Sequence, residues 1–102
     1  MRVIDLDATS WRNVSDFYDA LLEALGAPGW HGRSIDALVD SVVWGGINTV
    51  APPYTIRVWH AAEAPKAVVE KIDLAKHAIA EGRSEFRARN GRDVEVELET
   101  MR

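Results

Sequence analysis

The residues with the types and spacing for chemistry lie together between Trp30 and Asp40, in a stretch that reads WHGRSIDALVD. Asp36 and Asp40 are four residues apart, so on a helix they share one face, where two like charges repel by roughly a few tenths of a kcal/mol. His31 precedes them in a loop that contains glycine. A histidine with two nearby carboxylates can act as a general base with orienting acids, which is the chemistry of a small hydrolase. The same carboxylates can instead form a solvated surface or bind basic groups.

Catalysis finds little further support in the sequence. A catalytic pair needs a nucleophile or a stabiliser of developing charge, yet the chain has no phosphate-binding loop and no nucleophile elbow. His60 and His77 each precede a glutamate by three or four residues, but neither pair has a third ligand at a metal-binding spacing. The chain has no cysteine, which excludes disulfides and thiol catalysis. We therefore expect neither enzyme activity nor a metal or cofactor site.

Two tryptophans flank the acidic pair. Trp30 lies in the loop before it, and Trp44 lies just after it, followed by Gly45 and Gly46. In protein interfaces a few residues contribute most of the binding free energy, and these are often aromatic residues beside charged groups. The pattern therefore favours a protein-binding surface over an active site.

Composition and charge indicate the class of partner. The 102 residues, 47% of them hydrophobic, are enough for one core, and we expect a single domain over 1–102. Residues 1–46 hold seven acids and three bases, a net charge of −4, whereas residues 47–102 hold nine of each. An acidic half argues against direct nucleic-acid binding and suits a basic protein. Because no apolar run could span a membrane or form a signal peptide, we expect a cytoplasmic protein without membrane contact.

Hydrophobic spacing predicts the helices that position this stretch. They are expected over residues 15–25, 34–43, 65–80 and 84–90. Ser15 and Ser34 are favoured N-caps, and Gly26 is a favoured residue just past a helix end. Gly82 is expected to break the helical pattern between the last two helices. The acidic pair is thus predicted to lie on the second helix.

Strands are predicted over residues 3–7, 54–59 and 93–99. The order strand, two helices, strand, two helices, strand implies right-handed crossovers and a parallel sheet. In the last strand apolar residues alternate with acids, so one face of the sheet is expected in water, with Arg57 among Glu95 and Glu97. The predicted fold class is α/β, a three-stranded parallel sheet with helices packed on one face.

The central stretch and the order of elements match a known pattern. The matching residues are Phe17, Leu21, Leu25, Pro28, Gly32, Asp36, Ala37, Leu38, Asp40 and the strand from Tyr54 to Trp59. With these residues the chain resembles the barstar family, small intracellular inhibitors of secreted bacterial ribonucleases. The resemblance spans nearly the whole chain in topology and is specific in the central stretch, so it implies a barstar-like fold.

The resemblance implies inhibition by mimicry of phosphate. A ribonuclease active site is basic because it holds phosphate, and Asp40 would enter it as a phosphate substitute, with Asp36 beside it. Trp30 and His31 would cover the catalytic residues of the enzyme, and Gly32 would permit close approach. The residues expected to bind the partner are therefore Trp30, His31, Gly32, Asp36, Asp40 and Trp44. The expected partner is one basic ribonuclease, bound one to one.

Several positions depart from the family pattern. Arg33 stands where the type member has an acid, Val39 replaces a large aromatic residue, and Trp44 stands one place before the family's tryptophan. The alanine and arginine at 88–89 fall near an acid that the family contributes from its last helix, for which Glu85 is a loose substitute. These changes indicate a different cognate ribonuclease, such as the nuclease toxin of a rival-killing system.

Two alternatives remain open. One is an immunity or regulatory module that uses the same acidic face for another basic protein, which is distinguished by whether the captured partner cleaves RNA. The other is a small hydrolase that uses His31, Asp36 and Asp40, which turnover of a phosphodiester by the protein alone would support.

Overall fold

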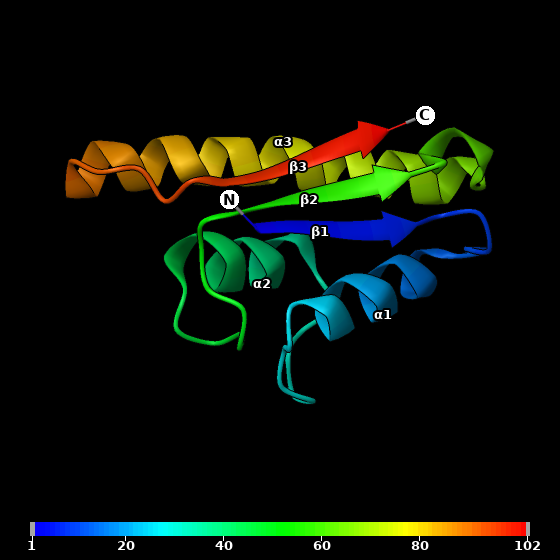
Figure 1. Ribbon diagram of the computed structural model, residues 1–102, viewed down its shortest axis with the longest axis horizontal. Coiled ribbons are helices and arrows are strands. Elements are labelled where there is room, and N and C mark those ends of the chain that lie inside the picture. The colour runs from blue at the N-terminus through cyan, green and yellow to red at the C-terminus, as the bar shows by residue number, and fades with distance from the viewer. Residues whose placement is uncertain (1, 102) are drawn as a thin grey trace.

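A computed structural model of the chain describes residues 2–101. Its strands are β1 (Arg2–Asp7), β2 (Tyr54–Trp59) and β3 (Val96–Met101), and its α-helices are α1 (Val14–Ala24), α2 (Ile35–Val39) and α3 (Lys66–Asn90) (Figure 1). Two short helical turns complete it, the π-helical η1 (Asp40–Trp44) and the 3₁₀ turn η2 (Ala61–Glu63). The two terminal residues of the domain expected over 1–102 lie outside the described residues.

The sheet is parallel throughout, with β2 between β1 and β3. The side chains that face the helices are buried, namely Ile4, Leu6, Tyr54, Ile56, Val58, Val96 and Leu98. Acidic side chains of β1 and β3, such as Asp5 and Glu97, are exposed on the opposite face. The predicted three-stranded parallel sheet with helices on one face is confirmed, and β2 has the predicted bounds.

The last strand begins later than the sequence indicates. Glu95 precedes β3 with a φ of 53°, and the register places Arg57 beside Glu99. The Arg57 Nε lies 3.8 Å from a carboxylate oxygen of Glu99. The prediction that Arg57 lies among Glu95 and Glu97 is therefore wrong in register, because the chain turns at Glu95 before the ladder starts.

The first helix also begins earlier than predicted, because Asn13 and not Ser15 is its N-cap. The Asn13 side-chain oxygen accepts a hydrogen bond from the Asp16 amide at 3.0 Å, and an Asp16 carboxylate oxygen accepts one from the Asn13 amide at 3.3 Å. This reciprocal pair satisfies two amides that the first turn leaves free. Ser15 is left available for a contact with the central loop.

The break predicted at Gly82 is wrong, since α3 runs through it without interruption as one helix. Gly82 is buried, and a Cβ there would lie 2.8 Å from Val39 Cγ1 and 3.3 Å from Val43 Cγ2. The missing side chain therefore lets α2 and η1 approach α3 closely. The requirement is one of space between helices, which a one-dimensional pattern cannot distinguish from a helix break.

We expect Gly82→Ala to lower the free energy of unfolding by about 1 kcal/mol. Overpacking costs about 1–3 kcal/mol, and the better helix propensity of alanine returns about 1 kcal/mol. Urea denaturation measures the change, and the double variant Gly82→Ala/Val39→Ala should lose less than the sum of the two single losses. A Gly82→Ala protein more stable than wild type would contradict the close approach.

An ion pair joins α3 to the segment before β3. Arg83 Nε and Nη2 donate to the two carboxylate oxygens of Asp93 at 2.7 and 2.6 Å. This bidentate hydrogen bonding from Arg83 holds the pKa of Asp93 well below its usual range. The pair fixes the direction in which the chain leaves α3 and enters the sheet.

The lowered pKa of Asp93 should make the free energy of unfolding depend on pH in the acid range. A carboxyl with a lower pKa in the folded state binds fewer protons there, so its stabilisation is complete above about pH 4 and is lost as the pH falls further. We expect the free energy of unfolding of the wild type to fall more steeply from pH 4 to pH 2 than that of Asp93→Asn. Urea denaturation across this range gives both curves, and parallel curves would exclude the effect.

Candidate partner-binding site

The acidic pair lies on α2 and at the start of η1, as the N-cap and the buried stripe require. The Ser34 hydroxyl oxygen accepts from the Ala37 amide at 3.1 Å, and Leu38 is fully buried beneath the helix. Asp36 and Asp40 are both exposed on the outer side. A short helix of only five residues is thus held at its cap and by one core side chain.

Regular helix was predicted up to Val43, but the chain widens into a π turn at Asp40. The Gly45 amide donates to the Asp40 carbonyl at 3.1 Å, five residues back, and Gly45 has a φ of 77°. Such π turns inside helices are frequent at functional sites. The wider turn sets the direction from Asp40 to Trp44, which a pattern based on 3.6 residues per turn does not predict.

The loop before α2 exposes one aromatic residue and buries the other. Trp30 is 75% exposed, whereas His31 is 8% exposed. The His31 Nδ1–H donates to the Gly32 carbonyl at 2.7 Å, and Nε2 lies 2.7 Å from the Ser41 hydroxyl. In the free protein His31 therefore fixes the loop against η1, and its expected contact with a partner stays a prediction.

The hydrolase arrangement is not assembled in this structure. Within residues 2–101, neither ring nitrogen of His31 is bonded to Asp36 or Asp40, because both nitrogens are used within the loop and η1. The sequence did not indicate a role for Ser41, which is buried and whose hydroxyl oxygen also lies 3.1 Å from the Leu38 carbonyl oxygen. A serine beside an apolar stripe gives no sign of its role in the sequence. The role becomes visible only when the structure places it beside His31, ten residues earlier in the chain.

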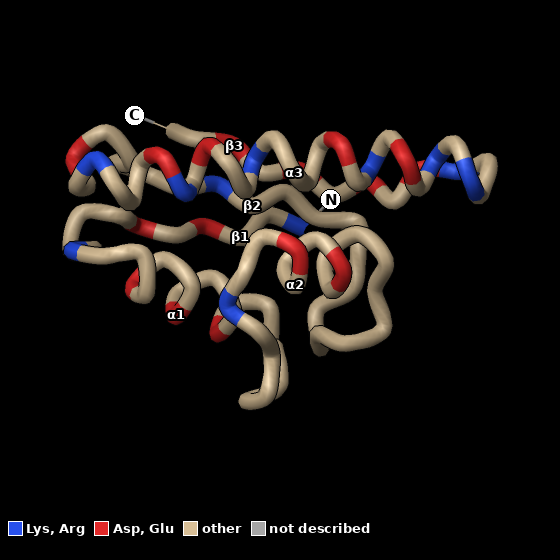
Figure 2. The backbone as a smooth tube through the Cα atoms, turned by 180° about the vertical axis from the view of Figure 1, so that it is seen from behind, with Lys and Arg blue, Asp and Glu red and all other residues tan. Residues whose placement is uncertain are grey.

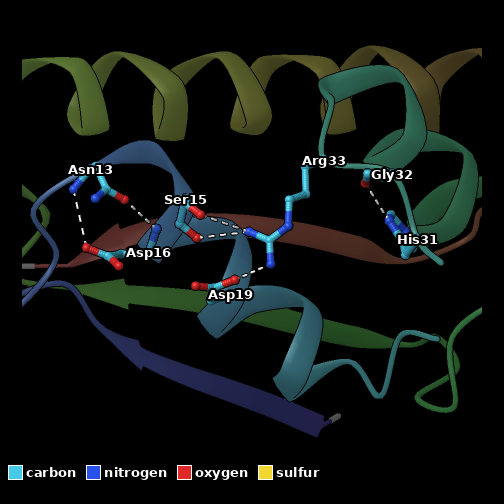
Figure 3. A network of polar contacts seen from close by, with 7 residues as sticks. All are labelled: Asn13, Ser15, Asp16, Asp19, His31, Gly32 and Arg33. Carbon is cyan, nitrogen blue, oxygen red and sulfur yellow. Dashed lines mark hydrogen bonds and ion pairs between the residues drawn. The ribbon is translucent and has the colours of Figure 1, made fainter. Parts of the chain in front are cut away.

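Arg33 reaches from the loop before α2 to Ser15 and Asp19 of α1 (Figure 3). Its guanidinium donates to the Ser15 carbonyl and hydroxyl at 3.3 and 3.2 Å and forms an ion pair with Asp19. The positive charge of Arg33 is therefore paired with Asp19 on α1 and not with Asp36 or Asp40. These contacts, like the His31 bonds, hold the loop that presents Trp30.

A groove of about 700 Å³ runs between α2, η1 and α3. Four carboxylates line it, those of Asp36, Asp40, Glu81 and Glu85. None of the four forms an ion pair with another residue of the described chain, and no lysine or arginine lines the groove. Figure 2 shows acids on the neighbouring turns of α2 and α3. The groove therefore presents uncompensated negative charge to a partner.

A comparison with protein families decides the family of this chain. The family model described as Barstar (barnase inhibitor) matches residues 1–99. The chain belongs to the barstar family. No curated protein matches it. Barstar-family proteins are inhibitors that bind a protein partner, so the family supports a barnase-inhibitor-like function.

Two structural findings bear on other classes of site. In the described part of this barstar-family protein, no group of three or more His, Asp or Glu side chains could hold a metal ion. Among the helices of residues 2–101, none combines the length and the apolar character needed to cross a membrane.

Proposed function

We propose that this barstar-family protein is a non-enzymatic, cytoplasmic inhibitor that binds one molecule of a basic ribonuclease and blocks its active site. One observation carries the proposal. Asp36 and Asp40 lie exposed on one short helical segment, without an ion pair inside the chain, at the edge of a groove with two further acids. A basic partner would supply the positive charge that compensates these carboxylates.

The proposed mechanism is substitution of a phosphate by a carboxylate. Asp40 enters the phosphate site of the enzyme, and Asp36 pairs with basic groups beside it through charge-assisted hydrogen bonds. Trp30 and His31 cover the catalytic residues of the enzyme, and Gly32 permits the close approach of the loop. The partner's positive charge also removes the repulsion between the two aspartates, a local cost that folding alone leaves in place.

For the partner enzyme we propose a class and not an individual protein. We include the nuclease toxins of rival-killing systems, in which this protein would act as the immunity protein or antitoxin. Support comes from the departures from the family pattern at Arg33, Val39 and Trp44, which lie within or beside the proposed interface.

The test is a calorimetric titration of the full chain against a panel of small, basic ribonucleases from bacteria, with RNA cleavage followed in parallel. We expect at least one enzyme to bind with a stoichiometry of one to one and to lose activity. A partner that binds but does not cleave RNA would instead establish a regulatory module. Phosphodiester turnover by the purified protein alone would establish the hydrolase.

A further inference from the structure

Two arginines at the C-terminal end of α3 and just beyond it are held against aromatic rings. Arg89 Cζ lies 5.7 Å from the centroid of the Trp44 ring, and Arg92 Cζ lies 5.2 Å from that of Phe86. The two rings pack on each other at 5.2 Å. Both arginines are exposed, and neither forms an ion pair with any residue from 2 to 101.

Trp44 lines two neighbouring hollows of the surface. It lines the acidic groove with Asp40 and also a second hollow of about 330 Å³, whose charged lining residues are Arg92, Glu95 and Asp93, the last of them paired with Arg83. The basic end of α3 is visible in Figure 2, beyond the acids of its middle turns. Arg89 and Arg92 therefore place exposed positive charge beside Trp44, next to the acidic groove.

The contact with an aromatic ring orients each guanidinium so that it can bind an anion. A guanidinium stacked on an aromatic face has part of its freedom already restricted, while its N–H donors remain free for a carboxylate. Arginine pairs with carboxylates in a bidentate manner, and an adjacent like charge on a partner would be repelled. Such a cluster can select between partners that present the same basic active site.

We propose that Arg89, supported by Arg92, determines which ribonuclease this protein inhibits. Arg89 pairs with a carboxylate at the rim of the enzyme's basic active site, and it rejects enzymes that carry a basic residue at that place. This inference rests on the proposed function and specifies the charge pattern of its partner. The cognate enzyme has a basic centre with an acidic patch on the side that meets Trp44.

The test uses the full chain and every ribonuclease of the panel that the wild type inhibits. We expect Arg89→Gln to weaken inhibition by about 10-fold and Arg89→Glu by about 100-fold, since the latter places a like charge against the enzyme's carboxylate. Lys66→Gln removes the same charge at the other end of α3 and should leave inhibition unchanged. Arg89→Lys should inhibit more weakly than the wild type but more strongly than Arg89→Gln, because lysine keeps the charge and loses the bidentate, ring-stacked geometry.

Two further readouts separate recognition from a structural role. The tryptophan fluorescence of Arg89→Lys should match that of the wild type. Arg89→Glu should recover binding to an enzyme whose rim carboxylate is changed to lysine. Undiminished inhibition by Arg89→Gln, or tighter binding by Arg89→Glu, overturns the inference alone. If the wild type inhibits no ribonuclease, the proposed function fails, and this inference fails with it.

Discussion

Asp40→Asn should weaken inhibition of the cognate ribonuclease by about 300-fold. Truncating one partner of a buried, hydrogen-bonded charge pair at an interface costs about 2–5 kcal/mol, a range informed by measurements on the barnase–barstar pair of this same family. At about 1.4 kcal/mol per factor of ten, the middle of that range gives the expected loss. Inhibition of RNA cleavage and calorimetry measure it.

The folded state should tolerate this change, because Asp40 is exposed and is repelled by Asp36. Urea denaturation of Asp40→Asn should therefore give a stability equal to or slightly above that of the wild type. Glu97→Gln is the matched control, since it removes the same charge on the exposed face of the sheet. Equal effects of the two variants on inhibition would mean that net charge alone acts.

Leu38→Ala should cause the largest loss of stability at the site, about 2–5 kcal/mol. Leu38 is fully buried, and it is the one buried residue of the short helix that carries Asp36. Because small domains are stable by only about 5–15 kcal/mol, this loss would be a large fraction of the total. Urea denaturation measures it, and a weaker inhibition at 37 °C should accompany it.

Leu74→Ala is the control for this prediction. Leu74 is 57% exposed on α3, so the same truncation should change stability by no more than about 0.5 kcal/mol. Equal losses for the two leucine variants would contradict the role given to Leu38, namely that it anchors α2 to the core.

Local and periodic signals of the sequence predicted much of the fold. The bounds of β2, the parallel sheet, the helices on one face and the Ser34 cap follow from alternation, spacing and capping chemistry, which act between residues close in the chain. The long α3 did not follow, because Gly82 can be read either as a break or as room for a neighbour. The positions of Val39 and Val43 beside Gly82 in the folded chain distinguish these two interpretations.

The contacts that hold the site in place were harder to predict from the sequence than its charged residues. The acidic pair stands out from its spacing, and the structure exposes both aspartates beside Glu81 and Glu85. The bonds from His31 to Ser41 and from Arg33 to Asp19 join residues 10 and 14 positions apart. Contacts at such separations depend on how the elements pack, so a sequence pattern does not reveal them. The roles of the site residues toward a partner remain predictions.

Competition for the active site tests the central claim most directly. The cognate ribonuclease is saturated with a mononucleotide that occupies its phosphate site, and the full chain is titrated into it by calorimetry. If Asp40 replaces the phosphate, the apparent affinity falls in proportion to the mononucleotide concentration, and bound mononucleotide is displaced at a ratio of one to one. An affinity that does not change with the mononucleotide would show that the inhibitor binds elsewhere and would contradict the mechanism.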